Sequence, residues 1–154
     1  MTKLGLKQIN NAVLLLSDKE TLKELHLIQD YCAFGYPSKK TVSNLIKKRG
    51  FIKVETKRVP LSDNNEIEKA LGQYGVICVD DVIDELWNRD AEKFKVIKNS
   101  IWPFQLTPND KLVKAEIKHD ATGKTVKKNQ MKASKGGVIG NVEEKINDLV
   151  CQLI

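Results

Sequence analysis

The sequence is poor in the residue types from which metal and redox sites are built. It has two histidines, His26 and His119, which lie far apart, and three cysteines, none of which forms a C-x-x-C pair. Zinc and redox sites need such residues at close spacing, so we expect no metal site. An odd number of cysteines among apolar neighbours is typical of buried thiols in a reducing compartment.

Long hydrophobic runs are also missing. The longest runs only from Ala12 to Leu16, whereas a helix that crosses a bilayer needs about 20 apolar residues. We therefore expect no membrane partner.

The sequence also lacks the common catalytic motifs. It contains neither G-x-S-x-G nor H-E-x-x-H. Thr122–Thr125 ends like a phosphate-binding loop, but Lys118 stands where that motif requires a glycine. We interpret the segment as a turn and predict no enzyme, no cofactor and no small-molecule substrate. The alternative, an enzyme with a nucleotide site at Gly123–Thr125, would require ATP or GTP binding.

What the sequence does have is positive charge, gathered in blocks. Its net charge is +6 and its isoelectric point about 9.2. Residues 31–60 carry eight cations against the single acid Glu55, residues 61–95 carry nine acids and four cations, and residues 96–140 carry nine lysines and three acids. This alternation predicts one face that attracts phosphate and another that meets water or a basic partner.

Hydrophobic spacing predicts an alternation of helices and strands. Ser17 and Glu20 form an S-x-x-E capping box, which favours a helix from there to about Ala33. Gly50 follows the basic helix at a position where φ is commonly positive. The expected helices cover residues 17–33, 38–49, 62–71, 80–87 (with further turns through 94–97) and 141–153, and the expected strands cover 13–16 and 51–59.

The strongest functional signal is a cluster of cations on one predicted helix and the strand that follows it. Positions three or four apart share a helix face and alternate positions share a sheet face, so several of these charges are expected on one surface. Such a surface binds phosphate with an affinity that falls steeply with salt. Its members are Lys39, Lys40, Lys47, Lys48, Arg49, Lys53, Lys57 and Arg58.

Aromatic residues stand beside the cluster. We expect Phe34 and Phe51 to pack in the core. Tyr36, on a turn between Gly35 and Pro37, is the better candidate to stack on an unpaired RNA base. Residues 107–140 have few apolar anchors, and we interpret them as an extended basic loop or hairpin that is ordered mainly by its partner. There, Lys127, Lys128, Lys132 and Lys135 are further candidate RNA contacts.

Several longer motifs resemble a known family. They are Tyr31–Pro37, Val42–Phe51, Lys57–Asn64, Leu71–Cys78, Ile101–Phe104 and Gly140–Asn141 with the terminal helix. Together they closely resemble the large-subunit ribosomal protein family called L-thirty in bacteria and L-seven in eukaryotes. The Trp-Pro-Phe block and the C-terminal extension are similar to the eukaryotic or archaeal form.

The resemblance implies an α+β fold, in which a small antiparallel sheet has helices packed on one face, with a C-terminal helical extension and an extended basic loop. The corresponding division is a core over residues 1–106, the basic loop over 107–140 and a C-terminal helix over 141–154. It also implies a structural protein of the cytoplasmic ribosome, nucleolar during assembly in a eukaryote. Its partners would be large-subunit ribosomal RNA, including five-S RNA, and neighbouring ribosomal proteins.

The sequence departs from the family in two places. Leu4–Ile9 resembles the end of the family's first helix, so the preceding strand and basic extension would be missing and the sheet would have an open edge. Residues 111–135 resemble an insertion. A paralogue that acts in large-subunit assembly has nearly the same core and remains an alternative, as does a free RNA-binding regulator.

Overall fold

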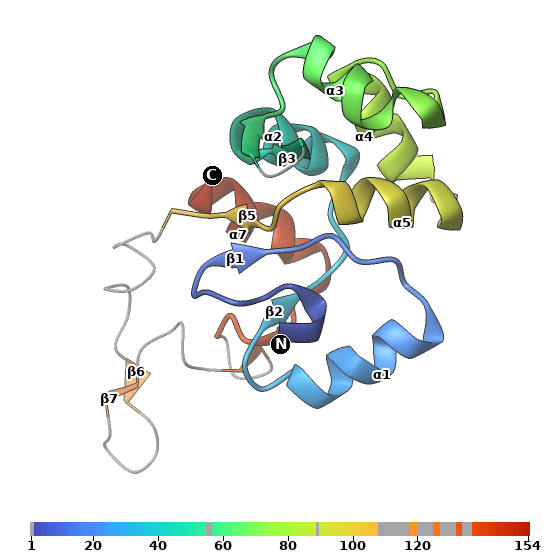
Figure 1. The fold of residues 1–154 in the computed structure, drawn as a ribbon. Helices are drawn as coiled ribbons and strands as arrows, with labels where there is room; N and C mark the ends of the chain where they lie inside the picture. The colour runs from blue at the N-terminus through green and yellow to red at the C-terminus, as the bar shows by residue number, and fades with distance from the viewer. Residues whose placement is uncertain are drawn as a thin grey trace. The chain divides into compact units, whose positions relative to one another are not determined.

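The structure is a computed structural model that describes residues 2–54, 57–88, 90–107, 118–119, 125–126, 132–133 and 137–154. The chain divides into two compact units. One comprises residues 1–16, 39–106 and 154, and the other comprises residues 17–38 and 107–153. Helices and short strands alternate along the chain (Figure 1), which confirms the expected α+β class.

In the first unit, helices pack against a β-hairpin. Its helices are α2 (Lys39–Arg49), α3 (Asn64–Leu71), α4 (Val79–Asn88) and α5 (Ala91–Ser100), with single 3-10 turns at Thr2–Leu4 and Gly72–Tyr74. Its strands are β1 (Asn11–Ala12), β3 (Phe51–Val54), β4 (Lys57–Pro60) and β5 (Phe104–Gln105). β3 pairs antiparallel with β4, and β1 pairs antiparallel with β5.

The core of this unit forms where the apolar side of each helix meets the inner side of the hairpin. α2 contacts α4, α4 contacts α5, and both α3 and α5 contact β3. Ile46, Ile52, Ile67, Leu71, Val76, Val82 and Ile97 are fully buried. Helical spacing predicted the buried residues Val42, Leu45 and Ile46 of α2, Ile67 and Leu71 of α3, and Val82, Ile83 and Leu86 of α4. Trp87, which the same spacing predicted to face inward, is 37% exposed.

Gly50 connects α2 to β3, and the reason for a glycine there differs from the predicted one. Its φ is not positive, so that prediction is wrong. A Cβ at this position would instead overlap the carbonyl oxygen of Ile46 and lie 2.8 Å from the Leu61 side chain. Glycine is needed here because backbone and core approach it closely.

α4 also begins one residue earlier than the start predicted at residue 80. The helix begins at Val79, and the Asp81 carboxylate accepts hydrogen bonds from the backbone N–H groups of Ile77 (3.1 Å) and Cys78 (3.0 Å). Hydrogen bonds from the Cys78 side chain and then from these backbone groups lower the pKa of Asp81. The thiol of Cys78 accepts from the Asp81 N–H at 3.4 Å.

Both predicted strands differ from what the structure contains. The strand expected at 13–16 is absent, and these residues are half-buried without strand pairing, whereas β1 lies just before them. β1 forms where it does because Asn11 pairs with Gln105 and Ala12 with Phe104. The single strand expected over 51–59 is the β3–β4 hairpin, whose connecting residues 55–56 lie outside the described part of the chain.

The second unit is built around a parallel pairing of distant segments. Its elements are α1 (Lys19–Ile28), β2 (Ala33–Phe34), β6 (Lys118–His119), β7 (Thr125–Val126), β8 (Gly140–Asn141), a 3-10 turn at Glu143–Lys145 and α7 (Ile146–Leu153). β2 pairs parallel with β8, and β6 pairs antiparallel with β7. The final helix was predicted from 141, but a 3-10 turn precedes it.

The helix predicted over 17–33 is shorter than expected. α1 follows Asp18, whose side chain makes no capping bond, so the predicted Ser17 capping box is wrong. α1 ends at Ile28 because the chain beyond it turns to pair with β8, where Gly140 N–H donates to the Cys32 carbonyl at 2.9 Å. Gly140 has φ of 100°, which favours glycine. Among the described helices, none is long and apolar enough to cross a membrane.

Candidate nucleic-acid interface

The basic helix α2 has one buried side. Thr41, Val42, Leu45 and Ile46 are buried. Its lysines Lys39, Lys40, Lys47 and Lys48 lie around the rest of the helix, and Lys40 and Lys47 point in nearly the same direction because they are about two turns apart. All four are exposed.

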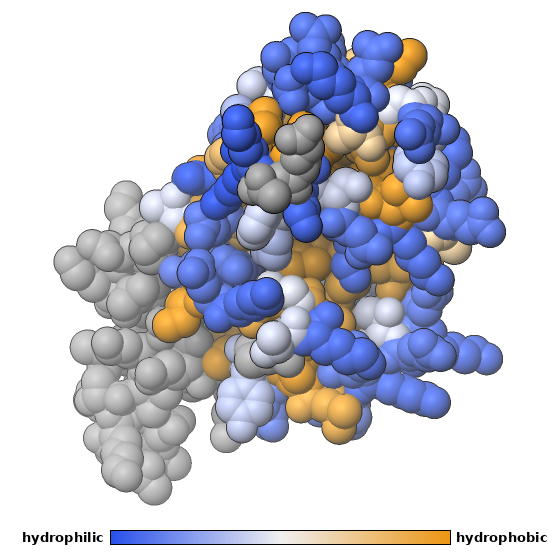
Figure 2. All heavy atoms as spheres, in the orientation of Figure 1, coloured by the Kyte–Doolittle hydropathy of each residue, from blue (hydrophilic) through white to orange (hydrophobic). Residues whose placement is uncertain are grey.

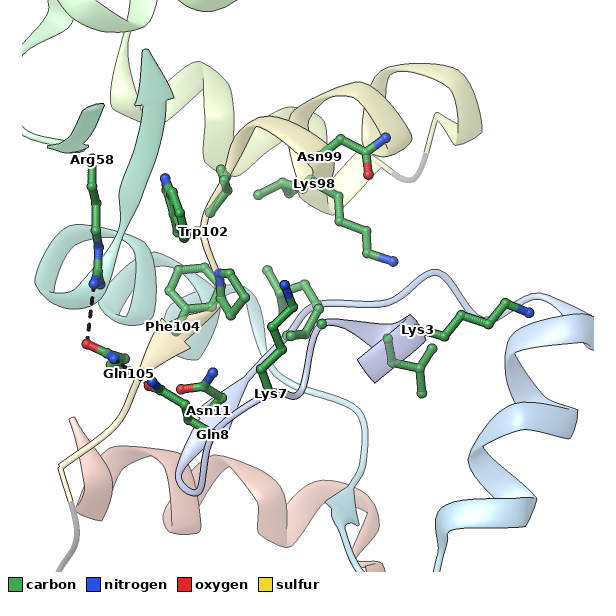
Figure 3. A pocket seen from close by; sticks show the side chains of 17 residues that line it. Lys3, Lys7, Gln8, Asn11, Arg58, Lys98, Asn99, Trp102, Phe104 and Gln105 are labelled. Carbon is green, nitrogen blue, oxygen red and sulfur yellow. Dashed lines mark hydrogen bonds between the residues drawn. The ribbon is translucent and has the colours of Figure 1, made fainter. Parts of the chain in front are cut away.

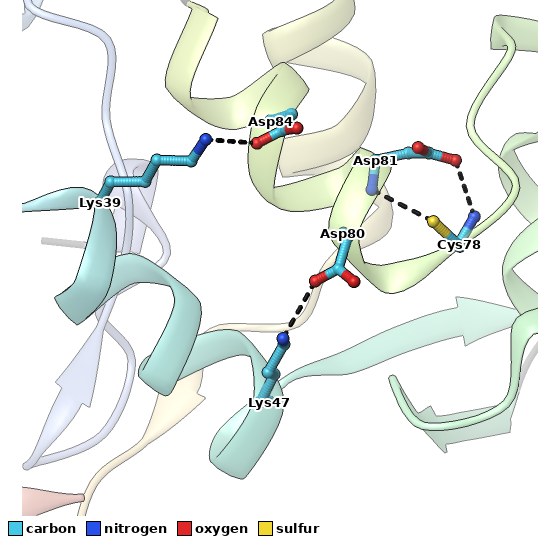
Figure 4. A network of polar contacts seen from close by, with 6 residues as sticks. All are labelled: Lys39, Lys47, Cys78, Asp80, Asp81 and Asp84. Carbon is cyan, nitrogen blue, oxygen red and sulfur yellow. Dashed lines mark hydrogen bonds and ion pairs between the residues drawn. The ribbon is translucent and has the colours of Figure 1, made fainter.

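Two of these lysines are paired with acids of α4. Figure 4 shows Lys39 and Lys47 reaching from α2 to Asp84 and Asp80, with N–O distances of 2.7 Å and 3.0 Å. All four side chains stay more than half exposed to water. Each pair is therefore worth at most about 1 kcal/mol. Its larger effect is to neutralise charge locally.

These pairs alter the predicted separation of charge. The acidic segment does not form a face apart from the basic helix, because α4 lies against α2. Acids near the start of a helix are favoured by its dipole. In the structure Asp80 and Asp84 also bind the lysines opposite them.

The two arginines of the cluster make contacts within the chain. Arg49 is half-buried and donates to the main-chain oxygen of Ile154 at 2.9 Å. Arg58 lies over the ring of Phe51, 3.9 Å from its centroid, and donates to Gln105 Oε1 at 3.3 Å. Phe51 is half-buried, as is Phe34, so neither packs in the core as predicted.

The hairpin places two cations directly opposite each other. Lys53 pairs in register with Arg58, so both side chains lie on the same face of the hairpin. Like charges in this arrangement repel, which favours an anion between them. Lys57, at the start of β4, is also exposed.

The chain is similar to ribosomal proteins over nearly its whole length. It is 40% identical to the large ribosomal subunit protein uL30 of Yarrowia lipolytica over 147 residues, which are 96% of this chain and 54% of the relative. It is 37% identical to the uL30 proteins of Caenorhabditis elegans, over 98% of this chain and 56% of the relative, and of Dictyostelium discoideum, over 96% and 54%. Over this matched length, the chain is similar to uL30 proteins of the large ribosomal subunit.

Two further findings concern the length of the match and the family models. The chain spans about half the length of the curated relatives it matches. No family model matches the sequence.

The remaining predicted contacts fall in the second unit. Tyr36 is 60% exposed, and its N–H donates to the Glu143 carbonyl at 3.3 Å. Lys132 is exposed and pairs with Asp30 at 2.7 Å. Lys127, Lys128 and Lys135 lie outside the described residues, as do Gly123 and Lys124 of the excluded phosphate-loop motif.

Four cations of the predicted cluster are thus exposed and form no ion pair within the part of the chain that the structure describes: Lys40, Lys48, Lys53 and Lys57. Among the described residues no group of histidines, cysteines and acids could hold a metal ion. What these four side chains offer a ligand is positive charge.

Sequence reasoning missed a second group of basic residues. Lys3, Lys7 and Lys98 line one cavity together with Arg58. They escaped notice because they come from separate segments, and because residues 1–30 carry equal numbers of acids and cations. Only the folded arrangement brings them together.

Proposed function

We propose that this chain is a structural, non-enzymatic constituent of the large ribosomal subunit, which binds folded ribosomal RNA through basic side chains. The observation that carries the proposal is the 37–40% identity to uL30 proteins over at least 96% of the chain. The exposed lysines Lys40, Lys48, Lys53 and Lys57 support it, because RNA presents closely spaced phosphates.

We further propose where the chain works and what it binds. It works in cytoplasmic ribosomes, which in a eukaryote are assembled in the nucleolus. Its partners are large-subunit RNA, including five-S RNA, and neighbouring ribosomal proteins. Lys39 and Lys47 contribute mainly to α2–α4 pairing, since their charge is shared with Asp84 and Asp80. Tyr36, Lys132 and the lysines of the basic loop, Lys127, Lys128 and Lys135, are additional RNA contacts.

The test is incorporation into ribosomes. A tagged chain carrying Lys53→Glu and Lys57→Glu should enter large subunits several-fold less than the unaltered chain, because reversal places acids against phosphate. A matched control reverses Lys19 and Lys23, two exposed lysines on α1 outside the basic block. The control should incorporate normally.

Sedimentation separates this proposal from the assembly-factor alternative. A structural constituent is found in mature large subunits and polysomes. An assembly factor is found only with precursor particles and would overturn the proposal, as would equal incorporation of the two double variants. A free RNA-binding regulator would stay at the top of the gradient.

A further inference from the structure

The first unit contains a cavity that the proposed function leaves unused. Its volume is about 550 Å³, within the range of small-ligand sites. The walls come from the segment around β1, the end of α5, β5 and the hairpin residue Arg58 (Figure 3).

The lining of this cavity is basic. Lys3, Lys7, Arg58 and Lys98 line it, and none of its described lining residues is acidic. Lys98 is half-buried, so its ammonium group is less well solvated than on an open surface. A concave site that gathers charge of one sign concentrates ions of the opposite sign, so the expected ligand is an anion.

The cavity also has an aromatic wall. Trp102 lines it and is 40% exposed, whereas Phe104 beside it is buried. The Trp102 backbone is held in place, because its N–H donates to the Phe51 carbonyl at 2.9 Å. An accessible indole is a suitable surface for a nucleobase, since bases stack on aromatic rings whatever their sequence.

One wall is braced by a chain of side-chain hydrogen bonds. Arg58 donates to Gln105 Oε1 at 3.3 Å, and Gln105 Nε2 donates to Gln8 Oε1 at 3.0 Å. Figure 3 shows this chain running from the hairpin to the β1 segment. Because Arg58 also stacks on Phe51, the exposed face of the hairpin continues into the cavity.

We propose that the cavity receives one unpaired nucleotide of the bound RNA. Its base lies against Trp102, and its phosphates lie among Lys3, Lys7, Arg58 and Lys98. This rests on the proposed RNA-binding function and adds a specific preference to it: the chain favours RNA with an extruded base over a continuous duplex.

The test compares two RNA hairpins with the same stem, one of which carries a single bulged nucleotide. Fluorescence anisotropy of labelled RNA should show tighter binding of the bulged hairpin by the full chain. Trp102→Leu should weaken binding of the bulged hairpin by about 5- to 150-fold, the range for loss of one base–aromatic stack. Binding of the fully paired hairpin should change less than twofold.

The matched control is Trp87→Leu, because Trp87 is similarly exposed, at 37%, but does not line the cavity. It should alter neither affinity. Trp102→Phe keeps a ring and should restore most of the preference, which separates loss of stacking from loss of folding. As a direct readout, 2-aminopurine at the bulge should lose fluorescence on binding when Trp102 is present.

Equal binding of both hairpins by the unaltered chain would overturn the cavity proposal and leave the proposed function standing. So would an equal loss of the preference in the Trp87 and Trp102 variants. Absence of salt-dependent binding to either hairpin would overturn the proposed function itself.

Discussion

The two lysine pairs of α2 have the same spacing, on the same helix, in different surroundings. Lys39 and Lys47 are paired with acids of α4, whereas Lys40 and Lys48 form no ion pair in the described structure. Sequence composition treats all four alike. The difference teaches that a basic block serves two tasks, since part of its charge stabilises packing within the chain and the rest is left for a partner.

Gly50→Ala would disturb both lysine pairs at once, because Gly50 joins α2 to the hairpin. An added Cβ would overlap the Ile46 carbonyl, so we expect the free energy of unfolding to fall by about 2–3 kcal/mol. Thermal and urea unfolding measure the loss. Gly72→Ala is the control: its φ is −57° and the nearest atom to a Cβ would be 3.4 Å away, so that variant should retain full stability. Equal stability of the two variants would contradict the packing argument.

Neutralising the two lysine pairs separately compares them most directly. Lys40→Gln with Lys48→Gln should weaken RNA binding about tenfold at physiological salt and lower the slope of log K against log salt by about 1.5. Lys39→Gln with Lys47→Gln, the same charge change at the same spacing, should produce less than half of either effect. Filter binding over a salt series provides the measurement. Identical slopes would mean that α4 does not withhold the first pair.

The ion pairs themselves should contribute little to stability. Double-mutant cycles of Lys39 with Asp84 and Lys47 with Asp80, using alanine, should give coupling energies of about 0.2–1 kcal/mol, because all four side chains are largely exposed. The coupling should shrink in 1 M salt. Coupling above 2 kcal/mol would show that pairing, rather than neutralisation, is their main role.

Asp81 provides the test with the smallest expected effect. Its carboxylate accepts hydrogen bonds at the start of its own helix, whereas Asp80 and Asp84 pair with lysines of α2. Its pKa is lowered in the folded chain, so its stabilising effect is complete above its ordinary pKa and is lost as pH falls through the lowered value. Asp81→Asn should therefore lower the melting temperature at pH 7, and the difference from the unaltered chain should shrink toward pH 2. A constant difference across this range would contradict the assignment.

Local sequence patterns predicted the elements whose reasons are local. The apolar spacing of Val42, Leu45 and Ile46 marked α2, and Asp63 marked the start of α3, where its carboxylate accepts the Asn65 N–H at 3.0 Å. The resemblance to large-subunit ribosomal proteins predicted both the similarity to uL30 proteins and the α+β class.

The rest depends on partners far away in the sequence. β1, β2, β5 and β8 are only two residues long, so no alternating pattern has room to appear, and each forms because a distant strand pairs with it. The α2–α4 ion pairs and the basic cavity have the same origin. A charge count records how many cations a segment holds, but their partners depend on the fold.

The parallel pairing of β2 with β8 has a consequence for synthesis. Ala33 and Gly140 are neighbours in space but more than a hundred residues apart along the chain. Synthesis proceeds from the N-terminus, so β2 is made early. More than a hundred further residues must follow before β8 can pair with it. Except for residue 154, the first unit requires nothing beyond residue 106. The helices of the first unit can therefore fold while β2, next to Tyr36, still lacks its partner strand β8.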